Sequence, residues 1–408
     1  MPPADNQGSF LNRISIRRNQ FSVVEAVNDQ ELEDLELLQK HVADRFSELL
    51  TTNDDSPAEE KSVRPGLQSI AWLRNLLDLF LSCEAEFKTV LIAGRDPSQF
   101  SKPPLDRLIP DLLERSVKAL DVCNAITHGI DLIQHWQKLA QIVVTALRQS
   151  PVGEGQIRRA QKALTTLLTS MFFDDKENTN ANFHLKWTDR TRSFGRRFSG
   201  AAALHGKDRS SGNNFRSFSW SVAKSWSAAK QIQNMTTNLV APRGADASGP
   251  AVPVYIMNTI LVFVMWALVA AIPCQERNGL STHFQTPRQL GWAQPIISLQ
   301  DKIGEDWKKK EKKGTLGLLE ELQKMEKVAN SLAEFTCSFG SPLDNEKAAE
   351  VEAQVAEMEE ICRRMEEGLA PLQQQVREVF HRIVRSRSEI LDVVDQITKI
   401  SAPAPVSF

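Results

Sequence analysis

Apolar side chains recur every three or four residues through the N-terminal part of the chain, with polar residues between them. This spacing places the apolar residues on one helix face and predicts amphipathic α-helices. The first pattern lies within residues 29–50 and the second within 67–91, where Glu84 stands at an apolar position. Asp, Ser and Pro residues at 51–66, and Gly-Arg-Asp-Pro at 94–97, are expected to end these helices.

The longest apolar pattern follows Pro103-Pro104 and covers residues 105–147, before Ser-Pro-Val-Gly at 150–153. It predicts one helix of more than forty residues, in which Gly129 is the candidate point for a break. A shorter pattern over 157–171 predicts a fourth helix. The alternation of apolar and polar residues that marks a β-strand does not occur over a convincing length, which favours an all-α fold.

The C-terminal region carries apolar side chains spaced alternately four and three residues apart over 351–397. Such heptads require a helical partner. Pro371 lies among them and is expected to kink or break the helix, giving an antiparallel pair or one bent helix. A preceding pattern over 318–335 predicts another helix. The helices of neither half of the chain can bury all of their apolar faces against one another. We therefore expect the helices after Leu343 to pack against those of 29–172.

The most apolar segment runs from Val254 to Ile272 and contains 19 residues without a charge. As a helix it would be about 28 Å long, close to the thickness of a bilayer's hydrocarbon core. A transmembrane helix is one interpretation, although Trp266 would then lie in mid-span rather than at an interface. The other interpretation, which we favour, is the buried centre of a helical bundle, where Asn258 would need a hydrogen-bond partner.

A basic segment lies at 184–230, where ten bases and two acids give a net charge of +8 among Ser, Gly, Phe and Trp residues. Its first half has the composition of a disordered linker, and helical spacing returns over 220–239. Ser199 and Ser219 lie just downstream of arginines, a pattern that suits kinases with basic substrates. A phosphate at either serine would remove much of the local positive charge.

The same basic segment has two further interpretations, attraction to an anionic membrane surface and a solvated linker without a partner. RNA binding is disfavoured because no RNA-recognition or OB-fold pattern accompanies the bases. The candidate contacts for an anionic surface are Arg190, Arg192, Arg196, Arg197, Arg209 and Arg216.

The amino-acid composition excludes some classes of protein but does not indicate a catalytic or binding site. The 49 Lys and Arg and 51 Asp and Glu residues give a net charge of −2, so the whole chain has no strong field for nucleic acid or an anionic membrane. Five scattered cysteines without a CxxC pair exclude a dense disulfide framework and a zinc finger. The first residues lack the continuous apolar stretch of a secretory signal, so we expect a reducing compartment.

Motifs of catalysis or cofactor binding are missing: the chain contains no GxxxxGK, GxGxxG, GxSxG or HExxH. We therefore predict no enzymatic activity, no catalytic residues and no cofactor. His128, Asp131 and His135 would share a helix face and could present two imidazoles and a carboxylate. A single helix rarely supplies all ligands of a metal, and we predict no metal here.

These patterns predict an elongated bundle of long antiparallel helices with a disordered basic linker. The predicted organisation is a flexible basic tail (1–28), an N-terminal helical region (29–172), a basic linker ending in a helix (173–250), the apolar helix (251–275), a loop (276–300), the heptad helices (301–400) and a tail (401–408).

Several sequence blocks resemble the plant-specific BYPASS-related family, most closely its exocyst-interacting Roh branch. The blocks are Gln-Glu-Leu-Glu-Asp-Leu-Glu at 30–36, Lys-His-Val-Ala-Asp-Arg-Phe at 40–46, Gly-Arg-Asp-Pro at 94–97, Lys-Pro-Pro-Leu-Asp-Arg-Leu at 102–108, Lys-Ala-Leu-Asp-Val-Cys-Asn at 118–124, Thr-His-Gly at 127–129 and Gly-Glu-Gly-Gln at 153–156. The resemblance covers essentially the full length. It implies a helical, non-catalytic plant protein that binds an exocyst subunit and influences polarised secretion, for example of cell-wall polysaccharides.

Two functional interpretations stay open at this point. The first is an adaptor of the cytosol and membrane periphery that docks onto a helical tethering complex. The alternative is a single-pass membrane protein with cytosolic helical regions in growth or developmental signalling. The sequence does not indicate an oligomeric state.

Overall fold

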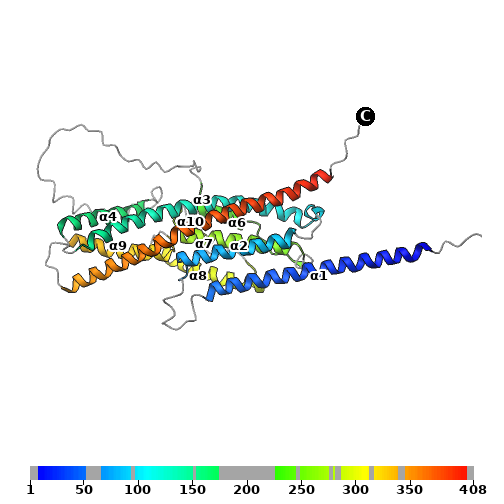
Figure 1. The fold of residues 1–408 in the computed structure, drawn as a ribbon, viewed down its shortest axis with the longest axis horizontal. Helices are drawn as coiled ribbons and strands as arrows, with labels where there is room; N and C mark the ends of the chain where they lie inside the picture. The colour runs from blue at the N-terminus through cyan, green and yellow to red at the C-terminus, as the bar shows by residue number, and fades with distance from the viewer. Residues whose placement is uncertain are drawn as a thin grey trace, which may run out of the picture.

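The amphipathic patterns of the sequence become long helices that lie side by side along one axis in the computed structural model (Figure 1). Every regular element among the described residues is helical, which confirms the predicted all-α fold. The residues that the structure describes are 8–51, 66–92, 97–149, 153–173, 226–244, 249–274, 279–280, 286–311, 317–338 and 345–401.

The long helices are α1 (Gly8–Thr51), α2 (Ile70–Ile92), α3 (Leu105–Leu147), α4 (Glu154–Phe173), α7 (Ala251–Ala271), α8 (Gln294–Glu311), α9 (Glu320–Ser338) and α10 (Asn345–Ser401). Shorter elements are the helix α6 (Ala228–Thr236) and the 3₁₀ turns η1 (Pro97–Ser101) and η3 (Gly291–Ala293).

Helix α7 forms the centre of this bundle. All 21 of its residues are buried, and α1, α2, α3, α6 and α8 contact it. The ring of Phe263 in α7 meets the ring of Phe46 in α1 edge to face, with centroids 5.7 Å apart. A helix that is apolar on every side needs such an enclosed position, because no face of it is suited to water.

Helix α10 packs along α3, α2 and α9, which confirms the predicted union of the C-terminal heptads with the N-terminal helices. Its heptad positions from Val355 to Ile383 are buried in the common core. The heptads therefore find their partner inside the same chain, and any second protein has to bind the outer surface.

Helix α3 continues without interruption through Gly129, where the sequence pointed to a break. Gly129 is buried against the end of α7, and a Cβ atom placed on it would lie 2.0 Å from the carbonyl oxygen of Pro273 and 2.7 Å from Cγ2 of Ile272. The glycine is thus explained by a close approach of two backbones and not by a change in helix direction.

We expect Gly129→Ala to lower the free energy of unfolding by about 1 to 3 kcal/mol, because the new methyl group overlaps backbone atoms that cannot rotate away. Alanine's better helix propensity, about 1 kcal/mol, opposes this only in part. Gly155→Ala in α4 is the matched control, since no atom lies within 4 Å of the added Cβ. Urea unfolding of both variants measures the difference, and a stabilised Gly129→Ala would contradict the close-approach explanation.

Helix α10 likewise continues through Pro371 as one helix, so the first of the two alternatives, an antiparallel pair, does not occur. A proline within a helix removes the hydrogen bond to the carbonyl four residues earlier, here that of Glu367. Glu367 is exposed, so water can solvate that carbonyl, while Leu369 and Leu372 on either side of the proline are buried in the core. Packing of the flanking turns holds the helix together.

Two helix boundaries differ from the sequence patterns. Helix α1 begins at Gly8, inside the segment interpreted as a flexible tail, because extending an existing helix costs far less than starting one. Helix α8 begins at Gln294, inside the segment interpreted as a loop. The N-terminal part of α1 and the C-terminal end of α10 both project beyond the bundle at the same end (Figure 1).

Helix ends inside the bundle are closed by other parts of the chain. The backbone N–H groups of Leu318 and Leu319 donate to the carbonyls of Ala270 and Ala271 at the end of α7. The carboxylate of Glu321 accepts from the N–H of Ile70 at the start of α2, at 3.2 and 3.3 Å. These bonds satisfy backbone groups that a helix end leaves open, and they fix α9 against α2 and α7.

Candidate interaction surface

A set of polar bridges joins α2 to α10 on the outside of the bundle. Arg74 Nε donates to Gln375 Oε1 at 3.0 Å, and Gln375 Nε2 donates to Asp78 Oδ1 at 2.7 Å. Further along, Lys88 forms an ion pair with Glu389. The two helices are thus aligned by side chains at several points along their shared edge.

The most buried of these bridges joins Glu84 of α2 to Arg382 of α10. Arg382 Nη1 lies 3.2 Å from Glu84 Oε2, and the two side chains are 31% and 4% exposed. Burial raises the pKa of the Glu84 carboxyl, while a hydrogen bond with the Ser386 side chain and the nearby charges of Arg382 and Lys88 partly oppose that rise. Arg382 is therefore one of the groups that favour the charged form of this buried carboxyl.

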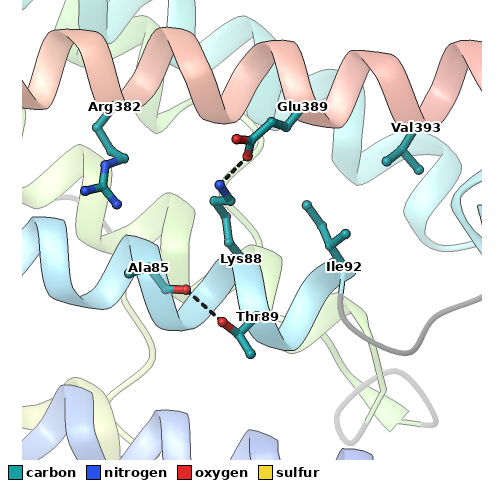
Figure 2. A pocket seen from close by; sticks show the side chains of 7 residues that line it. All are labelled: Ala85, Lys88, Thr89, Ile92, Arg382, Glu389 and Val393. Carbon is teal, nitrogen blue, oxygen red and sulfur yellow. Dashed lines mark hydrogen bonds and ion pairs between the residues drawn. The ribbon is translucent and has the colours of Figure 1, made fainter.

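An open groove of about 510 Å³ lies between α2 and α10 beside this ion pair. Figure 2 shows its walls, with the Lys88–Glu389 ion pair across it and the Thr89 hydroxyl donating to the carbonyl of Ala85. The groove is lined mainly by carbon atoms, and its lining residues are Ala85, Lys88, Thr89, Ile92, Arg382, Glu389 and Val393. Its charged walls are neutralised in pairs, so its interior offers apolar surface.

The charges along α10 are unevenly distributed. Residues 350–367 contain seven acids and two bases, whereas 377–387 contain four arginines and one acid. Both bases of the first stretch form ion pairs: Arg363 with Glu360 and Glu367, and Arg364 with Glu360. Arg377 and Arg385 are exposed and form no ion pair with any residue that the structure describes.

The thiols that the structure buries are not activated. Burial raises the pKa of Cys83 to about 11 and those of Cys123 and Cys362 to about 12. A nucleophilic cysteine needs the opposite shift, towards the thiolate at neutral pH. These three residues are therefore packing groups of the core.

The predicted site residues are distributed as follows. Val254 and Ile272 are both buried at the ends of the apolar helix segment. His128, Asp131 and His135 are exposed on α3, and Asp131 Oδ1 accepts a hydrogen bond from Gln373 of α10 at 2.6 Å. The candidate phosphorylation and anionic-surface residues Ser199, Ser219, Arg190, Arg192, Arg196, Arg197, Arg209 and Arg216 lie outside the described residues, and their roles stay predictions.

Asn258 does not meet the expectation for a fully satisfied core. Its side chain is 3% exposed, and its Oδ1 atom has no hydrogen-bond partner among the described residues. Leaving a buried carbonyl without a donor costs about 1 to 3 kcal/mol. The neighbouring Thr259 avoids this cost, because its hydroxyl donates to the carbonyl of Tyr255 at 2.9 Å.

The residues around the groove were not singled out by motif analysis, since no local pattern marks a site formed between two helices far apart in the chain. One signal was present: Glu84 occupies an apolar position of its helix. A charged residue at a core position requires a partner of opposite charge, and Arg382 is that partner.

Comparisons with known proteins agree over nearly the whole chain. The family model described as Protein ROH1-like matches residues 1–394. Protein ROH1A of Arabidopsis thaliana is 54% identical over 414 residues, covering 98% of this chain and 99% of that protein. Protein ROH1D of the same plant is 44% identical over 412 residues, covering 97% and 98%. No solved structure matches. The chain belongs to the ROH1-like family, a plant protein family related to BYPASS.

Proposed function

We propose that this protein is a non-catalytic helical adaptor that docks onto a helical subunit of the exocyst and modulates polarised exocytosis, including secretion of cell-wall polysaccharides. Membership in the ROH1-like family indicates a regulatory protein of plants. The observation that carries the finer proposal is the full-length resemblance to the exocyst-interacting branch.

The surface of the bundle supports a docking role. The apolar heptad positions of α10 are used inside the bundle, so they do not require a second protein for folding. The outer face of α10 keeps exposed arginines and lies beside an apolar groove. Those two features are what a reversible helical partner would use on an already folded protein.

We also propose that the protein acts in the cytosol and at the membrane periphery, with α7 as the bundle core. The second candidate, a single-pass membrane protein, is favoured by one observation: α7 is long and apolar enough to cross a bilayer. Against it, α7 contacts helices that come from both sides of it in the chain, such as α2 and α8. A spanning α7 would separate these helices.

Co-precipitation of the intact protein from plant cells tests the docking proposal. We expect exocyst subunits to be recovered with the tagged wild type and not with an unrelated tagged helical protein of similar size. Failure to recover any exocyst component under conditions that preserve the complex would overturn the partner assignment.

Alkaline carbonate extraction of the same cells separates the two locations. We expect the protein to move into the soluble fraction, as a peripheral protein does. Retention in the membrane pellet, with the two ends of the chain accessible from opposite faces, would establish the single-pass alternative instead.

A further inference from the structure

Helix α6 is the shortest α-helix that the structure describes, and it covers part of α7. It spans nine residues and contacts α3 and α7. Its buried residues are Ala228, Ala229, Ile232 and Met235, so two of the four side chains are single methyl groups. A helix of this length is not stable by itself in water. It therefore depends on its contacts with α3 and α7.

A buried arginine binds the C-terminal end of α6. Arg115 of α3 is 5% exposed, and its Nε donates to the carbonyl of Met235 at 2.9 Å and its Nη2 to that of Thr237 at 2.7 Å. Burial lowers the pKa of Arg115, and the charges of Asp111 and Glu114 partly oppose that shift. No carboxylate among the described residues forms an ion pair with Arg115. Its hydrogen bonds within the described chain therefore all run to the end of α6.

The residues next to α6 add little cover. Trp226, Leu239 and Ala241 are only partly buried, and Val240 is 67% exposed. Residues 226–241, which we call the strap, thus bury few apolar side chains and expose much of their backbone to water. Segments with these properties open locally at a lower free energy than the packed core does.

The next shortest helix around α7 is held more firmly. Helix α8 has 18 residues and contacts α1, α7 and η3. It buries four large apolar side chains, Ile296, Leu299, Ile303 and Trp307. Lifting α8 from the bundle would expose far more apolar surface than lifting the strap, and apolar exposure is what opposes such a motion.

We propose that the strap opens while the rest of the bundle stays folded, and that it thereby uncovers apolar surface of α3 and α7. Opening exposes the four buried side chains of α6, and it also returns Arg115 to water. Hydration of the guanidinium offsets part of the lost packing, because a charge buried without a counter-ion is unfavourable. The inference concerns a motion within the chain and does not depend on the exocyst proposal.

Hydrogen exchange of the intact protein, followed by mass spectrometry at low urea concentrations, tests the proposal. The amides of 232–236 should exchange at least about a hundredfold faster than those in the middle of α7. Their exchange should also depend less on urea, because local opening exposes less surface than unfolding of the bundle. Equal rates and equal urea dependence in the strap and in α7 would overturn the proposal.

Ile232→Ala and Ile303→Ala remove the same side chain from the strap and from α8, and both isoleucines are fully buried. Ile232→Ala should accelerate exchange of the strap at least about tenfold, because the closed form loses packing that the open form never has. Ile303→Ala should leave strap exchange unchanged and accelerate that of α7, since α8 is packed in both forms of the strap. If Ile303→Ala accelerates the strap as much as α7, the strap opens only with the whole bundle. Ile232→Val and Ile303→Val give the same comparison with a smaller loss of stability.

A charge at the same two positions separates the strap from the core by a second measurement. Ile232→Glu should hold the strap open, because the carboxylate cannot be buried, yet the variant should keep a cooperative urea transition. Its apolar surface should raise the fluorescence of the dye ANS at least about threefold over the wild type. Ile303→Glu should lose the cooperative transition altogether. Loss of that transition in Ile232→Glu as well, or no increase in ANS fluorescence, would show that α6 is an inseparable part of the bundle.

Discussion

Val264→Lys is expected to abolish the folded state. Val264 lies near the middle of α7 and is fully buried. An ammonium group there would have neither water nor a counter-ion, and the protein would have to neutralise it or open the bundle. The loss of stability should be at least about 4 kcal/mol, a large part of what a domain of this kind has. Circular dichroism and urea unfolding of the purified protein measure the effect.

Val240→Lys is the matched control for this experiment, because Val240 is 67% exposed and tolerates the same change of residue type. We expect its unfolding midpoint to stay close to that of the wild type. In cells, the Val264 variant should be lost through misfolding while the wild type remains extractable from membranes. A folded, stable Val264→Lys protein would show that α7 is not the centre of the bundle.

Short-range sequence patterns predict which segments of this protein are helical. They do not predict how a glycine or a proline within a helix is accommodated. The heptads of α10 identified the buried positions because each apolar residue repeats with the period of a helix facing a partner. The same local reasoning marked Gly129 as the candidate point for a break and Pro371 as a kink or a break. Both residues lie in continuous helices, because the close approach at Pro273 and the packing of Leu369 and Leu372 outweigh intrinsic propensity.

Helix α8 shows a different limit, because its first residues lie in the segment interpreted as a loop (276–300) and the rest lies in the predicted helical region (301–400). Its buried residues Ile296, Leu299, Ile303 and Trp307 do follow helical spacing, but they stand among charged and polar residues and directly after a stretch rich in turn-forming residues. Packing against α1 and α7 stabilises this helix. A short amphipathic pattern is therefore less informative than a long one, since tertiary contacts decide whether it becomes a helix.

The interaction surface was even less accessible to sequence reasoning. The groove joins side chains of α2 to side chains almost three hundred positions later in α10, as the 298-residue separation of Glu84 and Arg382 illustrates. No motif spans such a distance. Only the position of Glu84 within an apolar pattern indicated that a basic partner was needed, and the partner's identity required the fold.

Arg382→Ala is the second substitution with a large expected effect. It leaves the Glu84 carboxylate buried without its arginine, and removing one member of a buried pair costs about 3 to 5 kcal/mol. Because the Arg382 side chain is 31% exposed, we expect about half of that cost. Arg377→Ala is the control on the same helix, since Arg377 is exposed and has no ion pair among the described residues.

The pH dependence of this effect identifies Glu84 as its origin. Burial raises the pKa of Glu84 in the folded protein above that of the unfolded chain, so the folded state holds the proton more tightly. Its contribution to stability is therefore fully present below the unfolded pKa and is lost as pH rises through the folded pKa. Removing Arg382 raises the folded pKa further and enlarges this loss. The cost of Arg382→Ala should shrink in acid, where Glu84 is protonated with or without the arginine.

A double-mutant cycle completes the argument. Glu84→Gln removes the buried charge while keeping the shape of the side chain, so Arg382→Ala should cost much less in the Glu84→Gln background than in the wild type. Urea unfolding at neutral and acidic pH measures all four proteins. Equal costs of Arg382→Ala in both backgrounds, or a cost independent of pH, would mean that Arg382 stabilises the protein through packing of its aliphatic stem alone. The coupling, if measured, would show that this ion pair holds α10 against α2 and so keeps the walls of the groove in place.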